Sequence, residues 1–236
     1  MQTVQDISTA KRHDIYSHIH KALRAIMADT MVRLGRLDRS DDTETAALVA
    51  QVKALCTFTE SHLQHEGEHV HPAMEQASPG STHAAATEHP QHVEECRRIS
   101  ALADRVLAAP AEARGALAAQ LYHALCLFMA ECLEHMHMEE TDNNQVLWAA
   151  YSDAQLHAIE MGIVATLTPE EHGMTLQWMI PSMTPEERLG MLGGVKMGAP
   201  VQVFCAMMEA LRQFLPARQW QQLADGLGYE APLLAA

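Results

Sequence analysis

Aromatic residues are scarce in this chain, and so are basic ones. Phe, Trp and Tyr together make up 5% of the 236 residues. Most of the apolar content comes from Ala, Leu and Met, which favour helices, whereas β-branched and aromatic side chains favour strands. We therefore expect an all-α protein. Lys and Arg number 16 against 30 Asp and Glu, for a formal net charge of −14. Because no basic patch exists, nucleic acid and anionic membrane surfaces are poor partners.

Long apolar runs and paired cysteines are missing as well. No run approaches the roughly 20 apolar residues that span a bilayer. The opening sequence, MQTVQDISTAKRHD, has no apolar stretch like that of a signal peptide. We therefore expect a cytoplasmic protein with no membrane partner. The five cysteines are odd in number and form no CxxC pair, which favours reduced, mostly buried thiols.

Apolar residues at helical spacing divide the first 150 residues into four long helices. We expect these helices over residues 9–37, 45–75, 87–108 and 111–150, with polar or Pro-containing breaks between them. Such a series predicts an up-down four-helix bundle. The second and fourth helices contain similar segments, ALCTF at 54–58 and ALCLF at 124–128, and each segment precedes a His-rich, acidic stretch. This likeness suggests two related hairpins.

The composition changes after residue 150, where histidine nearly disappears. The sequence TPEE occurs twice, at 168–171 and 184–187. Each copy offers a Thr N-cap, a Pro at the first helical position and a Glu at the third, which is the signature of a capping box. We expect residues 1–150 to form the bundle and residues 151–236 to form a C-terminal helical extension. Its apolar faces could form a homodimer interface.

Histidine is the residue that is abundant. Thirteen of the 15 lie between His13 and His137. The second and fourth helices each contain an H-x-x-x-E pair, His62 with Glu66 and His135 with Glu139. Residues four apart lie on one face of a helix, so each helix can direct one imidazole and one carboxylate to a common point. A carboxylate can bridge two cations, and imidazole is a good ligand for iron. The pattern therefore predicts a site for paired metals.

The first helix should contribute one histidine to that site. His18 and His20 lie about 200° apart around a helix axis, so only one of them can face the bundle interior. His20 shares a face with Leu23 and Met27, which favours His20.

The third helix offers His89 and His92. His92 lies 43 residues before His135, much as His20 lies 42 residues before His62, and this favours His92. Three residues are nearly one helical turn, so both could face inward. We expect a further group of histidines to lie on the solvated rim of the bundle, although any of them could instead orient a metal ligand: His65, His69, His71 and His137.

A ferritin-like di-iron bundle is a competing structure. It needs two E-x-x-H helices and one Glu from each of the other two helices. Glu66 with His69 and Glu134 with His137 could supply the E-x-x-H pairs. The first Glu of the chain is Glu44, however, so the first helix contains none. This shortage favours a histidine-dominated site.

These residues resemble the hemerythrin-like, or HHE cation-binding, domains of bacteria. The resemblance covers roughly residues 15–148 and rests on IHKALR, HLQHEGEHVHP, a His-containing start to the third helix, and HMHMEETDNNQVLW. It implies two non-haem iron ions with oxo or hydroxo and carboxylate bridges, binding dioxygen or nitric oxide. The bridging carboxylates would be Glu66 and Glu139, and Gly67 departs from the second Glu usual in the family. The implied metal ligands are His20, His62, Glu66, His92 or His89, His135 and Glu139.

The expected function is binding or sensing of dioxygen or nitric oxide, or handling of iron. A di-iron enzyme that reduces peroxide or nitric oxide, or that activates oxygen, is the first alternative. The second alternative is a zinc- or nickel-binding protein, or an interaction module built on the C-terminal helices. We expect a binding protein more than an enzyme.

Overall fold

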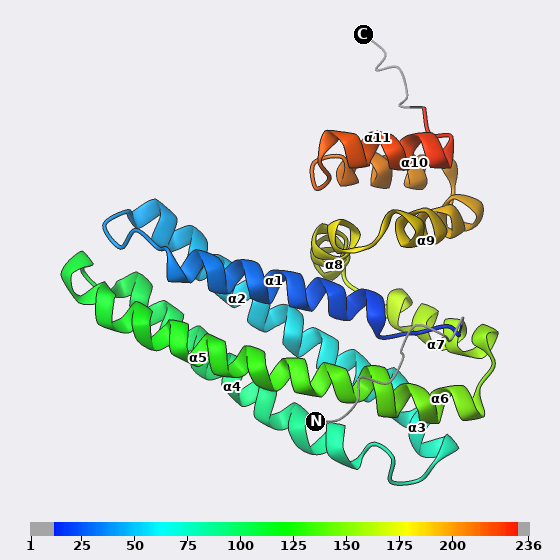
Figure 1. Ribbon diagram of the computed structural model, residues 1–236, viewed down its shortest axis with the longest axis horizontal. Coiled ribbons are helices and arrows are strands. Elements are labelled where there is room, and N and C mark those ends of the chain that lie inside the picture. The colour runs from blue at the N-terminus through cyan, green and yellow to red at the C-terminus, as the bar shows by residue number, and fades with distance from the viewer. Residues whose placement is uncertain (1–11, 231–236) are drawn as a thin grey trace, which may run out of the picture. The chain divides into compact units, whose positions relative to one another are not determined.

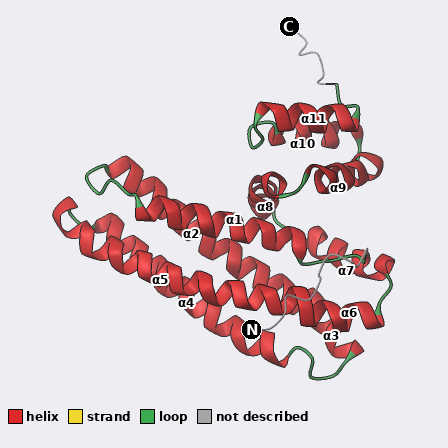
Figure 2. Ribbon diagram, viewed as in Figure 1, coloured by secondary structure: helices red, strands yellow, loops and turns green. Residues whose placement is uncertain are grey.

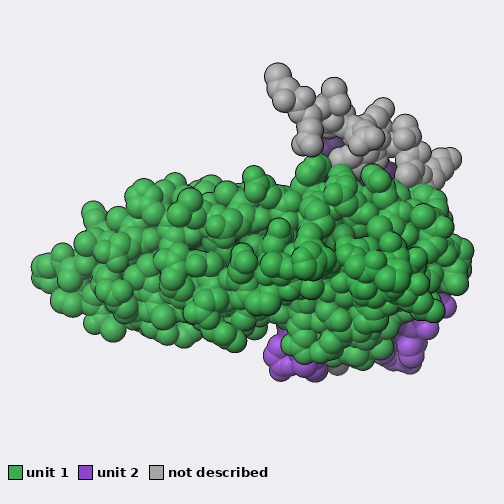
Figure 3. Space-filling model, turned by 90° about the horizontal axis from the view of Figure 1, so that it is seen from below, with its two compact units in different colours: residues 1–167 green, residues 168–236 purple. Residues whose placement is uncertain are grey.

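The computed structural model describes residues 12–230, which fold into helices joined by short loops and turns, with no strand among them (Figure 2). The chain separates into two compact units, residues 1–167 and residues 168–236 (Figure 3). The predicted all-α fold is confirmed. The domain boundary expected after residue 150 stays a prediction.

Four long helices form the bundle of the first unit (Figure 1). Leu23, Ile26, Leu55, Ile99 and Leu125 fill its interior and are almost completely buried, as the helical spacing of apolar residues predicts. Each helix packs against two others, α1 and α4 both lying against α2 and α5. The bounds are α1, Ser17–Gly35; α2, Asp42–His65; α4, His83–Ala108; and α5, Ala111–Met138.

Helices α2 and α5 both continue through a widened π-helical turn. The turn η2 spans Glu66–Val70 and leads into α3, His71–Ala77; the turn η3 spans Glu139–Asn143 and leads into α6, Asn144–Ala150. The backbone N–H of the residue after each turn donates to the carbonyl of the Glu five positions earlier. Isolated π turns inside α-helices frequently mark functional sites. Here each one begins at the Glu of an H-x-x-x-E pair.

A second layer of apolar residues closes the end of the bundle where the two π turns lie. Its members come from the segment before α1, from the π turn η2, from the helices that follow the two π turns, and from α7, Asp153–Thr166. Arg12 fixes the first of these segments, since its guanidinium contacts Asp153 and donates to two backbone carbonyls. The buried members of this layer are Ile15, Tyr16, Val70, Met74, Leu147 and Leu156.

The helical stretch Ala111–Ala150 is long and apolar enough, by length and composition alone, to cross a membrane. The core helix of a soluble protein passes the same test. This stretch carries His135 and Glu139, which are both buried inside the bundle. It is therefore weak evidence for a membrane span.

The described part of the second unit, residues 168–230, contains four shorter helices. Thr168 and Thr184 form the two predicted capping boxes, at the starts of α8 and α9. Gly228 ends the last helix with a φ of 56°, a left-handed conformation that glycine adopts without strain. The bounds are α8, Pro169–Ser182; α9, Pro185–Gly198; α10, Val201–Leu211; and α11, Ala217–Leu227.

Candidate metal centre

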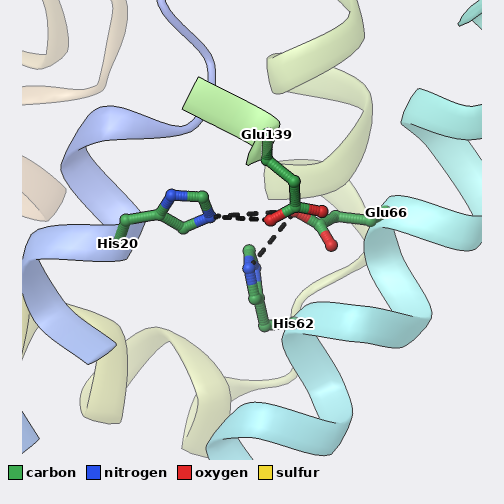
Figure 4. Close-up of side chains that lie close together, drawn as sticks. All are labelled: His20, His62, Glu66 and Glu139. Atoms are coloured by element: carbon green, nitrogen blue, oxygen red, sulfur yellow. Dashed lines mark ion pairs between the residues drawn. The ribbon is translucent and has the colours of Figure 1, made fainter. Parts of the chain in front are cut away.

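Each long helix of the bundle brings one histidine to the level of the two π turns. The two carboxylates, Glu66 and Glu139, project into the space between these histidines and are 3% and 0% exposed. Figure 4 shows part of this arrangement, with side chains from α1, α2 and both π turns directed at one another. The four histidines are His20 from α1, His62 from α2, His89 from α4 and His135 from α5.

The first group of potential ligands contains His20, His62, Glu66 and Glu139. One ligand atom from each lies within 4.8 Å of the others. The Nε2 atom of His62 is 3.2 Å from Oε1 of Glu66, and Nε2 of His20 is 3.4 Å from Oε2 of Glu139. Both imidazoles therefore present a ring nitrogen to the same pair of carboxylates (Figure 4).

The second group contains His89, His135 and the same two carboxylates, again within 4.8 Å of one another. The Nε2 atom of His135 is 3.1 Å from Oε1 of Glu139. The Nε2 atom of His89 is 3.5 Å from Oε2 of Glu66. Each carboxylate thus directs one oxygen towards the first pair of histidines and the other oxygen towards the second pair.

The facing atoms of this cluster are buried and unsatisfied. Among the described residues, no hydrogen-bond partner exists for Nε2 of the four histidines or for either oxygen of the two carboxylates. Buried polar groups normally have such partners, and leaving them without one is costly. Cations placed between the imidazoles and carboxylates would satisfy all of these atoms at once. The residues present therefore fit a metal site.

The two carboxylates influence each other strongly. Burial and the nearby charge of Glu139 raise the pKa of Glu66 well above its ordinary value. Burial alone would raise the pKa of Glu139 as well, but the imidazoles of His135, His20 and His89 hold it well below its ordinary value. Two buried carboxylates this close cannot both ionise without positive charge nearby. Metal cations would supply that charge.

Three of the four histidines have shifted pKa values, and the directions differ. Burial, together with the charge of His20, lowers the pKa of His62 well below its ordinary value, which keeps this imidazole neutral and able to bind a metal. Burial would also lower the pKa of His20, but Glu139 and Glu140 outweigh it and the pKa is raised. The pKa of His135 is raised in the same way, against burial, by Glu139 and Glu88.

Two of the histidines are held in place by carboxylates behind them. The Nδ1 atom of His20 is 3.0 Å from Glu140, and Arg24 donates two hydrogen bonds to the same carboxylate, at 2.6 and 2.9 Å. The Nδ1 atom of His135 is 2.7 Å from Glu88. In each case Nε2 is left to face the centre, an arrangement typical of metal-binding histidines. Sequence reasoning missed both Glu88 and Glu140.

A buried tyrosine lies beside the first pair of histidines. The rings of Tyr16 and His20 are 5.4 Å apart, and Asn143 donates a hydrogen bond of 3.4 Å to the Tyr16 hydroxyl. Burial and the charges of Glu66 and Glu139 raise the pKa of Tyr16 well above 10. The hydroxyl therefore stays protonated, and it donates a hydrogen bond of 3.8 Å to the sulfur of Met74.

Six of the seven predicted site residues make up the two ligand groups. The seventh, His92, lies outside both groups. Its ring is 4.9 Å from that of His135, and its Nδ1 atom is buried without a hydrogen-bond partner among the described residues. Burial and the charge of His135 lower the pKa of His92 to about 4. His92 is therefore a neutral imidazole next to the centre.

The rim position expected for His71 is wrong. This residue is only 9% exposed, and its ring stacks on that of His89 at a centroid distance of 4.9 Å. The cause is the π turn η2, which closes a hydrogen bond between residues five apart. It brings the residue five positions after Glu66 towards the interior, whereas a regular α-helix would turn it away.

A pocket of about 560 Å³ opens between α2 and α4. His89 is the one residue of the two ligand groups that lines it, together with residues of both helices that include Leu63 and Val93. The His89 side chain is 12% exposed, against 0% for His20. His89 is therefore the most exposed of the four histidines.

Comparison with known proteins is consistent with this geometry. The family model described as "Hemerythrin HHE cation binding domain" matches residues 12–147. Neither a curated protein nor a solved structure matches the chain. The match covers the whole bundle, both π turns and all six converging residues.

Proposed function

Since the chain belongs to the hemerythrin HHE cation-binding family, we propose that its buried cluster holds two iron ions and binds a small diatomic molecule, dioxygen or nitric oxide. Cation binding is the property that the family shares. The identity of the metal, the number of ions and the ligand are the steps proposed beyond it.

The observation that carries the proposal is the sharing of two carboxylates by two pairs of imidazoles. Glu66 and Glu139 belong to both ligand groups, which is the arrangement that a bridged pair of ions requires. A site for a single ion would leave one pair of imidazoles and two carboxylate oxygens unsatisfied in the interior. The combination of imidazole and carboxylate ligands suits iron, whereas structural zinc sites are closed four-ligand sites, most often rich in cysteine.

The surroundings support binding of a small ligand. When bound, the ions would supply an open coordination position, as metal sites with few protein ligands do. The pocket beside His89 gives a route to that position from outside. Inside, the apolar layer that contains Tyr16 and Met74 shields the centre from water, and the ring of Tyr16 lies 5.4 Å from that of His20.

The direct test is the metal content of protein purified without added metal, measured with its visible absorption in air. We expect about two irons per chain, since bridging by two carboxylates holds the ions as a pair. His62→Ala and Glu139→Ala should abolish both the iron and the absorption. A matched control is Glu134→Ala, which removes an exposed carboxylate from the same helix. Failure to take up iron after anaerobic reconstitution with ferrous ion would contradict the proposal.

The same protein separates a carrier or sensor from an enzyme. A dioxygen or nitric oxide adduct that forms stoichiometrically and decays slowly is expected for the binding function. Rapid turnover of peroxide or nitric oxide with an added reductant would instead assign an enzymatic role to the same centre.

A further inference from the structure

A second cluster of histidines and a carboxylate lies outside the buried centre, where α7 meets the segment that leads into α1. We propose that its three side chains, His13, His157 and Glu160, form a separate site for a divalent transition-metal cation such as Zn²⁺. One ligand atom from each residue lies within 4.8 Å of the others. None of these residues belongs to the two groups around Glu66 and Glu139.

The distances are those of a cation shell. The Nε2 atom of His13 is 3.0 Å from Oε2 of Glu160, and the Nδ1 atom of His157 is 3.4 Å from the same oxygen. Ligand atoms bound tetrahedrally to one Zn²⁺, with bonds of about 2.0–2.1 Å, lie about 3.4 Å apart. Two imidazoles and one carboxylate supply three ligands and leave a fourth position for water.

The backbone that carries the three side chains is held in place before any cation binds. His157 and Glu160 lie three residues apart on α7 and therefore share one face of the helix. The indole N–H of Trp148 donates a hydrogen bond of 2.8 Å to the backbone carbonyl of His13. Next to it, Arg12 is 2.7 Å from Asp153, the first residue of α7. Little conformational freedom is lost when a cation binds such a fixed set of ligands.

A simple ion pair accounts less well for this geometry. One imidazole would be enough for an ion pair with Glu160, yet two imidazoles direct a nitrogen at the same oxygen. The Nε2 atom of His13 is buried and makes no hydrogen bond to a described residue, although it lies 3.0 Å from that oxygen. A bound cation would satisfy both ring nitrogens and the carboxylate together.

Another group of similar composition, His65, Glu68 and His69, lies on the adjacent turn η2 and the end of α2. It is a poorer candidate because the carboxylate of Glu68 already accepts a hydrogen bond of 2.8 Å from Gln64. All of its ligands also come from one continuous helical stretch, so a cation there would not link two separate segments of the chain.

Occupancy of the proposed site would clamp the segment before α1 onto α7. The residues that follow His13, Ile15 and Tyr16, belong to the apolar layer that closes the bundle end, and Tyr16 packs on His20. The cation is therefore structural. It should raise the thermal unfolding midpoint of the first unit and slow the release of metal from the buried centre.

The test is a calorimetric titration of the full-length, iron-loaded protein with Zn²⁺, with iron content measured before and after. We expect one tight site, weakened more than about tenfold by His157→Ala and by Glu160→Gln, because each removes one of three protein ligands. The matched control His83→Ala removes an exposed histidine elsewhere on the same unit and should change nothing. Co²⁺ bound to the wild type should show the visible absorption of a four-coordinate ion, which both site variants lose.

Two results would overturn the proposal. One is the absence of a tight Zn²⁺ site in protein that retains its iron. The other is a tight site that survives His157→Ala and Glu160→Gln but is lost in His69→Ala, which would place the cation on η2. His157 is 60% exposed in its side chain, so its substitution should leave folding intact, and helical content measured by circular dichroism checks this. Iron content reports on the buried centre separately from Zn²⁺ binding. A negative result for the proposed Zn²⁺ site therefore does not contradict the proposed iron centre, and the reverse also holds.

Discussion

In the first half of the bundle, α1, α2 and η2 supply His20, His62 and Glu66. In the second half, α4, α5 and η3 supply His89, His135 and Glu139. Both halves use a histidine four residues before a glutamate, and both begin a π turn at that glutamate. Around this shared core the halves differ. Tyr16, a member of the apolar layer, packs against His20 of the first half. His89 of the second half lines the pocket between α2 and α4, and two further buried imidazoles, His71 and His92, lie beside His89 and His135.

The difference shows that the bridging ligands and their surroundings follow separate constraints. A bridged pair of ions fixes the positions of the imidazoles and carboxylates, so these must be similar in both halves. Access, hydrogen bonding and rigidity are set by residues behind the ligands, and here they diverge. The position after the bridging glutamate shows this directly: it is Glu140 in the second helix pair, where it holds His20, and Gly67 in the first.

Removal of a bridging carboxylate should affect the ligand groups of both halves equally. In Glu66→Ala, both groups of ligands lose a member, so we expect iron content to fall from about two per chain to nearly none. The same change at the exposed Glu131 on α5 is the control and should leave the iron in place. Retention of one iron in Glu66→Ala would show that the halves bind independently and that Glu66 does not bridge.

Glu140 and Glu88, the carboxylates that hold His20 and His135, should contribute unequally to metal affinity. Loss of such a partner typically lowers metal affinity by about 10- to 100-fold. We expect Glu140→Gln to lie at the upper end, because Glu140 is mostly buried and also pairs with Arg24. Glu88→Gln should lie at the lower end, since the Glu88 side chain is 44% exposed and water can replace it. Iron release to a chelator measures both, and the opposite order would contradict this account of the two halves.

The fold and most of the centre follow from local spacing. The pairs His62 with Glu66 and His135 with Glu139 need only the periodicity of a helix, and His20 was favoured over His18 because it shares a face with apolar residues. Residues linked across long separations were not predictable. Glu140 meets His20 over 120 positions, and Glu88 meets His135 over 47, and neither separation leaves a periodic signal.

The third helix and the π turns show why the rest was missed. Near-equal spacing favoured His92 over His89, but the structure directs Nε2 of His89, and not His92, at the carboxylates. Spacing between helices depends on loop lengths, which differ between the two halves, so it is a weak guide to register. A regular helix beyond Glu66 would place His71 on the rim, whereas the π turn η2 changes which face it occupies.

The pocket beside His89 should control the rate at which ligands reach the centre. Val93→Trp would narrow this pocket, and we expect association of azide or nitric oxide to slow by about tenfold, equivalent to about 1.4 kcal/mol of barrier. Iron content and equilibrium affinity should change little, because dissociation slows as well. Val32→Trp on α1, where Val32 is 54% exposed, is the matched control. Unchanged association in Val93→Trp, measured by stopped-flow absorption, would mean that ligands enter through the other half.

The smallest expected effect concerns Gly67, where the first half departs most clearly from the second. A side chain added there would meet no atom within 4 Å, so Gly67→Ala costs nothing in packing. It should raise the free energy of unfolding by about 0.5–1 kcal/mol, because alanine loses less conformational freedom than glycine in a helix. Gly173→Ala is the matched control, since Gly173 lies in the regular helix α8 and is equally free of neighbours. Chemical denaturation of the iron-loaded protein measures both. If Gly173→Ala stabilises while Gly67→Ala destabilises or lowers iron content, glycine is needed for the π turn itself, and the two halves form their widened turns by different means.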